Sequence, residues 1–274
     1  GRLAYWTGGF VNFGSSDTAA IQLSHTLVGV SGGVDYRFSP DFTGGIGAGY
    51  GRDVSDIGEN DTQSTGQATS AAFYGSYHPG HIFMDGLLGL SRLDFDSDRF
   101  VTTTGATATG SRGGSQFFGS LSSGYEFRQN GWLVSPYGRF QASWNRLDDF
   151  TESGAGAYNL SYGSQSLSML STVAGLRGEY AIPTSWGTLS TRGRVEYTHD
   201  FAGSSRAVLG YADTGTLPYG IDVLGLSQNS MSVEFGVEAQ FKHGVSLSFA
   251  YEGSFGFEDS AQDHTFLIKF KSKF

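Results

Sequence analysis

Apolar and polar side chains alternate at every second residue along much of the chain. In one stretch, Val245, Leu247 and Phe249 fall on one parity, while Ser246 and Ser248 fall on the other. Because a β-strand directs successive side chains to opposite faces, this alternation predicts a strand with one apolar and one polar face. An amphipathic helix would instead require apolar residues three and four positions apart. Similar alternation occurs at 117–128, 189–201, 231–241 and 266–274.

The predicted strands are joined alternately by short and long connections. The short ones carry Pro, Gly or Asn, which favour tight turns, and they lie at 39–41, 79–80, 129–131, 183–185 and 242–244. The long ones are polar and mostly acidic, and they lie at 14–24, 53–65, 98–112, 148–159, 202–228 and 256–262. Eleven connections predict twelve strands. The alternation is weak at 3–13 and 65–79, so the expected number is about twelve.

Long strands with tight turns at one end and long loops at the other are typical of an outer-membrane barrel. A soluble sandwich or large closed barrel is the alternative, and it would bury the apolar face instead. Three features favour the membrane: strand length, charges in mid-strand, and Trp132, Trp144 and Trp186 near strand ends. In lipid every backbone group must be paired, so the sheet has to close on itself. We therefore expect one all-β domain over residues 1–274, a transmembrane antiparallel up-and-down barrel.

The composition excludes several other classes of protein. Of 274 residues, 42 are Gly and 15% are aromatic, and the chain contains no run of about 20 apolar residues that a membrane helix would need. The net charge of −9 argues against a nucleic-acid partner. Without Cys there is no disulfide and no thiolate metal site, and we expect no cofactor. The chain starts with Gly rather than Met, so we expect a processed or excised piece of a longer protein.

The polar parity is expected to line a hydrated lumen. It carries charges of both signs, which indicates ion pairing rather than a filter of a single charge. The expected lumen-lining residues are Asp35, Arg37, Asp85, Glu126, Arg128, Arg139, Arg177, Glu179, Arg192, Arg194, Glu196, Glu234, Glu238 and Glu252. A row of inward glycines has two interpretations, a groove for another backbone or a site of bending and tight packing; it consists of Gly45, Gly47, Gly49 and Gly51.

Several segments resemble a known family. The last strand pair carries Ala-Tyr-Glu-Gly-Ser-Phe-Gly at 250–256, then Asp263-His264, then a closing strand ending in Lys273-Phe274. Together with Gly-Gly-Val-Asp-Tyr-Arg-Phe at 32–38, the turn, and the glycine-rich strand at 45–50, these segments resemble the C-terminal translocator domain of an autotransporter, the type V secretion system. The resemblance covers essentially the whole chain.

The resemblance implies a function in a Gram-negative outer membrane. Such a domain is inserted by the barrel-assembly machinery, supports passage of its own N-terminal passenger, and anchors it at the surface with a linker helix in the lumen. It would be an integral monomer in contact with lipid and lipopolysaccharide, with long loops at the cell surface and tight turns and C-terminus in the periplasm. The passenger is expected outside this sequence. The assembly signal is expected at Phe266, Ile268, Phe270 and Phe274, with Ser272 departing from the pattern.

Some members of the family cut off the passenger with acidic lumen residues. The candidates here are Asp35, Asp85, Glu126 and Glu179. We favour the alternative that these carboxylates pair with lumen arginines, namely Arg37, Arg128, Arg139 and Arg177. A row of Lys269, Lys271 and Lys273 is expected to pair with Glu252 or with an acidic face of the linker.

Two rival functions are a stand-alone porin and an outer-membrane hydrolase. A hydrolase would use His199-Asp200 with a nearby Ser, while the Gly-x-Ser-x-Gly match at 29–33 lies inside a predicted strand with no helix after it. We expect no enzymatic activity. The pair His78 and His81 and the triplet Asp94, Asp96 and Asp98 suggest metal ligands, but we interpret both as incidental surface groups, with the acidic loops solvated or sharing divalent ions with lipopolysaccharide.

Overall fold

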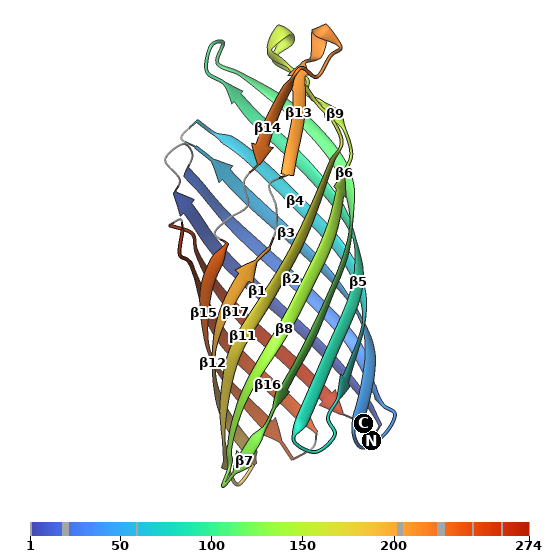
Figure 1. Ribbon diagram of the computed structural model, residues 1–274, viewed down its shortest axis with the longest axis vertical. Coiled ribbons are helices and arrows are strands. Elements are labelled where there is room, and N and C mark those ends of the chain that lie inside the picture. Colours follow the sequence, from blue (N-terminus) through green and yellow to red (C-terminus); the bar gives the residue numbers. More distant parts are fainter. Residues whose placement is uncertain are drawn as a thin grey trace.

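Twelve long antiparallel strands close into a barrel (Figure 1). The computed structural model describes residues 2–17, 22–58, 60–201, 205–223, 228–242, 244–258 and 260–273. The barrel strands are β1 (Leu3–Asp17), β2 (Gln22–Arg37), β3 (Phe42–Ile57), β4 (Thr62–Tyr77), β5 (Ile82–Val101), β6 (Ala106–Tyr125), β8 (Trp132–Leu147), β11 (Gln165–Pro183), β12 (Gly187–Asp200), β15 (Asn229–Phe241), β16 (Val245–Gly256) and β17 (Gln262–Lys273). The prediction of an all-β barrel of about twelve strands is confirmed.

The sheet closes where the first strand pairs with the last. β1 and β17 run antiparallel from Ala4 opposite Lys273 to Ser15 opposite Gln262. A short strand, β7 (Phe127–Gln129), continues β6 beyond Glu126 and keeps the same register against β8. Closure leaves no unpaired strand edge, which is the condition for a sheet to lie in lipid.

The outer face carries an apolar belt. Phe73 and Phe235, on β4 and β15, are exposed by 73% and 64%, far from each other along the chain. Trp132, Trp144 and Trp186 are also exposed, by 57%, 52% and 40%. So much large apolar surface is unfavourable in water but is expected of side chains that contact acyl chains.

A small second sheet lies at the end of the barrel opposite the termini (Figure 1). It contains β9 (Phe150–Thr151), β10 (Leu160–Tyr162), β13 (Ser205–Tyr211) and β14 (Tyr219–Val223), with the 3₁₀ helices η1 (Gly156–Tyr158) and η2 (Ala212–Thr214) in its connections. Within the described part of the chain, no helix has the length and apolar character needed to cross a membrane.

One buried carboxylate anchors the small sheet to the barrel. Glu152 accepts hydrogen bonds from Arg99 at 2.6 and 2.9 Å and from the backbone N–H of Leu160 at 2.8 Å. The bond to Glu152 raises the pKa of the Arg99 guanidinium, and burial raises the pKa of the nearby Tyr162 hydroxyl. This ion pair therefore ties β5 to the segment between β9 and β10.

Three of the connections expected to be long loops are mostly strand. β1 and β2 extend to Asp17 and from Gln22, β3 and β4 to Ile57 and from Thr62, and β5 and β6 to Val101 and from Ala106. The predictions of long loops at 14–24, 53–65 and 98–112 were therefore wrong; residues 18–21 of the first lie outside the described residues. The reason is physical: where a hairpin rises beyond the apolar belt, water wets both faces, so the strand has no apolar parity to reveal it.

Candidate functional site: the charged lumen

The strand register brings charges from distant parts of the sequence into one row. Arg177 of β11 lies opposite Arg194 of β12, Arg194 opposite Glu234 of β15, and Glu234 opposite Glu252 of β16. Side chains directly opposite one another in adjacent antiparallel strands are about 5 Å apart at Cβ and share a face. The two adjacent carboxylates would repel each other, so they need a cation between them.

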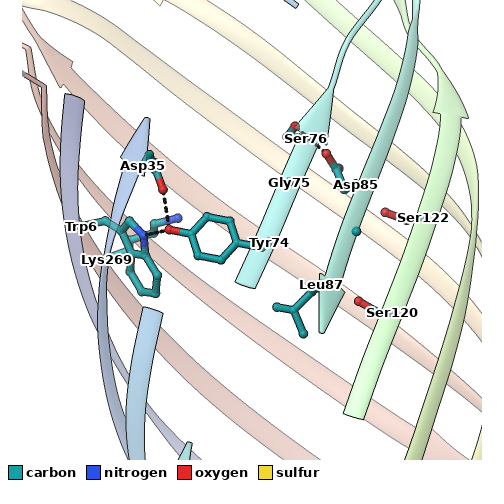
Figure 2. Close-up of a pocket in the computed structure, with 11 residues that line it drawn as sticks. Trp6, Asp35, Tyr74, Gly75, Ser76, Asp85, Leu87, Ser120, Ser122 and Lys269 are labelled. Carbon is teal, nitrogen blue, oxygen red and sulfur yellow. Dashed lines mark hydrogen bonds between the residues drawn. The ribbon is translucent and has the colours of Figure 1, made fainter. Parts of the chain in front are cut away.

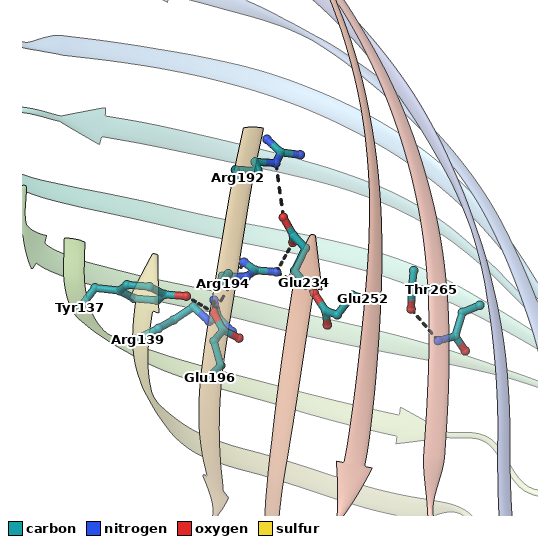
Figure 3. Close-up of polar contacts among 9 residues, drawn as sticks. Tyr137, Arg139, Arg192, Arg194, Glu196, Glu234, Glu252 and Thr265 are labelled. Atoms are coloured by element: carbon teal, nitrogen blue, oxygen red, sulfur yellow. Dashed lines mark hydrogen bonds and ion pairs between the residues drawn. The ribbon is translucent and has the colours of Figure 1, made fainter. Parts of the chain in front are cut away.

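Arg194 supplies that cation (Figure 3). Its Nη2 atom lies 2.6 Å from Oε2 of Glu234 and 2.6 Å from Oε2 of Glu252. Arg192 approaches the other oxygen of Glu234 with Nε at 3.4 Å. The side chain of Glu234 is only 13% exposed, so this pairing compensates for its partial removal from water.

Glu196 forms the second half of the same network. Arg139 donates to both carboxylate oxygens at 2.8 Å, and the hydroxyl of Tyr137 donates to Oε1. The Glu196 side chain is 4% exposed. The Tyr137 ring lies over Gly175, where any side chain would collide with it. We call these seven residues the inner charge cluster: Tyr137, Arg139, Arg192, Arg194, Glu196, Glu234 and Glu252.

A second cluster lies near the ends of β2 and β4 that lead into tight turns, at Arg37 and Tyr77. Figure 2 shows Trp6, Asp35, Tyr74 and Lys269 of this cluster. Asp35 of β2 accepts a hydrogen bond from Lys271 of β17 at 2.6 Å and one from the Tyr74 hydroxyl at 2.5 Å. Trp6 donates from Nε1 to the same hydroxyl at 2.5 Å, and Lys269 lies 5.4 Å from the Trp6 ring centroid. Lys271 of β17 and Asp35 of β2 lie on the two strands that flank β1. Their ion pair therefore links the last strand to the second across the seam, the place where the first and last strands pair.

A recess of about 400 Å³ opens beside this cluster (Figure 2). Its floor includes Asp85, which accepts a hydrogen bond from Ser76 at 2.6 Å and lies 3.5 Å from His78. His81 contacts the backbone oxygen of Glu126 instead, so the two histidines have different partners. Within the described residues no group of three potential metal ligands occurs.

Aromatic rings cover part of the inward glycine row. The Trp6 ring lies over Gly33 and Gly47, and a Cβ at Gly33 would come within 2.7 Å of it. The Tyr74 ring likewise fills the space above Gly45. For this end of the row the structure therefore favours tight side-chain packing over a groove for another backbone.

Glu126 is held by two arginines. Arg128 and Arg177 donate to its two oxygens at 2.7 and 2.8 Å, and the Glu126 side chain is 5% exposed. Arg177 also lies over the Phe83 ring, 5.0 Å from the centroid. This cluster joins β7 and the residue before it to β5 and β11 near the turn-bearing end of the barrel.

The pairings differ from the expected ones at several positions. Asp35 pairs with Lys271 rather than Arg37, and Glu252 pairs with Arg194 rather than with the lysine row. Arg139 binds Glu196, a carboxylate outside the cleavage candidates. The reason is register: Glu252 lies opposite Thr265 of β17, while Lys269 lies opposite Ser248. Arg194 shares the row of Glu252 through Glu234.

The remaining predicted residues occupy less tightly bonded positions. Arg37 ends β2 in an exposed position, Glu179 of β11 lies opposite Arg192, and the Ser248 hydroxyl donates to Glu238 at 3.4 Å. Phe266, Ile268 and Phe270 are exposed on β17, whereas Phe274 lies outside the described residues. Sequence reasoning missed Trp6, Tyr74 and Tyr137; the available signal was an aromatic residue on the polar parity across from a glycine.

The hypothetical hydrolase residues are not brought together. His199 and Asp200 are consecutive in β12, so their side chains point to opposite faces of the sheet. His199 contacts Asn229 at 2.8 Å on its own face, while Asp200 lies opposite Ser171. A proton relay from Ser through His to Asp cannot form across the sheet.

The Asp94, Asp96 and Asp98 triplet is part of a strand rather than of a binding loop. All three lie in β5, on the exposed parity, in extended backbone. Residues two apart in a strand are nearly 7 Å apart along it, so this arrangement does not wrap around one ion.

A family model described as the autotransporter β-domain matches residues 5–252. The chain belongs to this family. It is accordingly an integral outer-membrane barrel and the translocator unit of an autotransporter.

Solved structures share the fold over nearly the whole chain. The translocator domain of the autotransporter NalP from Neisseria meningitidis aligns with a TM-score of 0.82 at 15% identity, covering 100% of this chain and 89% of that one. The β domain of the Bordetella autotransporter BrkA gives 0.72 at 17% identity, covering 100% of both chains. The transport unit of AIDA-I from Escherichia coli gives 0.71 at 13% identity, covering 99% and 90%. At these identities the likeness supports the fold alone.

Two curated relatives are both named esterase EstA, from Pseudomonas aeruginosa and Pseudomonas putida. Each is 26% identical to this chain over 196 residues, which is 69% of this chain and 29% of the relative. The chain thus spans less than a third of the length of these relatives. The esterase name describes those longer proteins.

Proposed function

We propose that this barrel supports passage of its own N-terminal passenger and then holds a linker segment in its lumen. The observation that carries the proposal is the charged lumen, whose ionised groups are mutually paired rather than left free to bind a passing chain. The inner charge cluster contains Arg139, Arg192 and Arg194 against three glutamates, so its formal charge is zero. A neutral, hydrated wall lets polypeptides of different charge pass without a deep electrostatic trap.

The opposite wall supports the proposal by carrying one row of small side chains. Gly49, Ser70 and Ser91 lie in register across β3, β4 and β5. In the neighbouring row the rings of Trp6 and Phe118 cover Gly47 and Gly89. Small side chains on one wall and a charge network on the other suit a linker that has one polar and one small or apolar face. The linker would direct its polar face toward Arg194 and its neighbours.

We further propose an orientation in which the long-loop end lies at the cell surface and the tight turns lie in the periplasm. The chain contains no Cys, so single cysteines report position cleanly. Thr103, in the turn between β5 and β6, and Asp41, between β2 and β3, are both exposed. On intact cells a membrane-impermeant maleimide should label Thr103→Cys but not Asp41→Cys, and both should react after lysis. The reverse pattern would contradict the orientation.

Assembly by the barrel-assembly machinery is proposed to use the closing strand. Phe266, Ile268 and Phe270 form an alternating, exposed apolar row on β17, and Phe274 would continue its parity.

We also propose that the barrel contacts lipopolysaccharide, acts as a monomer and has no catalytic activity. Purified protein should hydrolyse no ester substrate above the level of a His199→Ala variant; activity lost with that histidine would contradict the proposal.

The decisive experiment is surface display. A secretion signal, a reporter domain and a helical linker are fused ahead of residue 1, and the reporter is detected on intact cells by antibody and by its sensitivity to added trypsin. We expect display from the full barrel and none from a matched fusion ending at residue 261, which lacks β17. A barrel that assembles, as judged by its heat-modifiable gel mobility, yet leaves the reporter in the periplasm would overturn the function and favour a porin.

A further inference from the structure

On the outer face of β5, β6 and β8, the apolar belt ends at a row of polar residues. Arg92 of β5 and Arg146 of β8 each lie directly opposite Ser115 of β6 in the strand register. All three are exposed. Adjacent strands are about 4.8 Å apart, so the two arginines are about 10 Å apart at Cα, with one small side chain between them. We call Arg92, Ser115 and Arg146 the basic row.

The next outward row, one step closer to the tight turns, is entirely apolar. It consists of Leu90, Phe117 and Trp144, again in register on the same three strands, and their exposed fractions are 63%, 40% and 52%. The rings of Phe117 and Trp144 stack with centroids 5.6 Å apart. A groove of about 450 Å³ runs along this apolar row and reaches Ser115 and Arg146.

One step further from the tight turns, two exposed carboxylates, Asp94 and Asp148, lie on either side of Gly113, but neither neutralises the basic row through a buried ion pair. Arg146 forms no ion pair with any residue that the structure describes. Arg92 lies 3.4 Å from Asp94, but the two side chains are 80% and 55% exposed, and such solvated pairs are weak. Planar guanidinium groups match phosphate oxygens in a bidentate fashion, and long basic side chains at the edge of an apolar belt reach the head-group layer.

We propose that the basic row binds the phosphates of a glycolipid in the outer leaflet, with its acyl chains lying along the apolar row. Two guanidinium groups on either side of Ser115 fit a sugar head group that carries two phosphates better than a head group with one. The apolar row spans three strands, which leaves space for more than one acyl chain. The proposal rests on the orientation given above, in which this edge of the belt faces the cell surface.

The chain offers a control arginine on the same outer face, in the register row of Gln67 and Asp94, one step further from the tight turns than the basic row. Arg52 of β3 is also exposed, but its register neighbours are Val28 and Gln67, so it has no second arginine within one strand. A lone guanidinium above the belt provides the same charge and the same side-chain length without the paired geometry. Replacing it separates binding by the basic row from a general attraction to anionic lipid.

The test is a lipid titration of the purified full chain in detergent free of lipopolysaccharide, read by native mass spectrometry. Diphosphoryl lipid A is the probe, with monophosphoryl lipid A and phosphatidylglycerol as comparisons. We expect Arg92→Gln and Arg146→Gln each to weaken lipid A binding about five-fold and the double variant about 25-fold, since each arginine near a lipid phosphate contributes about one such factor. Arg52→Gln should change binding less than about two-fold. Monophosphoryl lipid A should bind more weakly than the diphosphoryl form.

Three results would overturn the proposal. The first is a double variant that binds lipid A like the unmodified protein. The second is an Arg52→Gln variant that weakens binding equally. The third is phosphatidylglycerol that binds as tightly as lipid A with the same dependence on the basic row. All variants are first checked for heat-modifiable mobility, so that a misfolded barrel is not counted. Surface display by the same variants is expected to continue; loss of display from the unmodified barrel would instead contradict the proposed function, whatever the lipid titration gives.

Discussion

Replacing Arg194 by methionine should destabilise the barrel by about 3 kcal/mol. The substitution keeps most of the aliphatic stem but leaves Glu234 and Glu252 side by side without their shared cation. Because both carboxylate oxygens lie 2.6 Å from the same nitrogen, they are at most about 5 Å apart. Two unit charges at this distance, in a site with an effective dielectric constant near 20, repel by about 3 kcal/mol. This agrees with the lower end of the range for breaking a buried ion pair.

The measurement is urea-induced unfolding of the purified protein in detergent, followed by tryptophan fluorescence and by loss of the heat-modifiable gel band. Arg92→Met is the matched control, because its pair with Asp94 is exposed and should contribute less than about 1 kcal/mol. Adding Glu252→Gln to Arg194→Met should recover about 2 kcal/mol, since one of the repelling charges is then neutral.

The reasoning would be refuted by either of two outcomes. One is a loss below about 1 kcal/mol for Arg194→Met, which would mean that water in the lumen already screens the two carboxylates. The other is further destabilisation on adding Glu252→Gln, which would mean that Glu252 contributes through packing or through hydrogen bonds rather than through charge.

Three further predictions concern the seam, the small sheet and the closing strand. Asp35→Asn removes the charge that pairs with Lys271 across β1 and should lower the free energy of unfolding by about 1–3 kcal/mol, measured by the same urea series. An unchanged free energy of unfolding would contradict a structural role for this ion pair. Glu152→Ala removes the carboxylate that holds the small sheet, so limited trypsin digestion should cleave that sheet faster while the barrel band keeps its melting temperature. Phe270→Ser should reduce the fraction of assembled barrel in cells several-fold, whereas Phe13→Ser, an equally outward aromatic on β1, should have little effect; equal losses would argue against a signal on β17.

The local pattern determined the strands and the class of fold. Alternation with a period of two involves only residues that are neighbours in the sequence, so it does not depend on which strand lies alongside. The alternation around Phe249 is therefore sufficient to predict its strand. It failed at the tops of β3 to β6, near Ile57 and Val101, because strands wetted on both faces lose the contrast that the pattern depends on.

Only the tertiary structure decided which charges meet. Arg194 and Glu252 are far apart in sequence, as are Asp35 and Lys271, and their contacts depend on the register of several consecutive strand pairs. A shift of one residue in any pair would turn one partner to the other face, so no local pattern specifies these contacts. The same holds for the basic row of Arg92, Ser115 and Arg146, which exists because the register of two consecutive strand pairs, β5 with β6 and β6 with β8, places the three residues opposite one another.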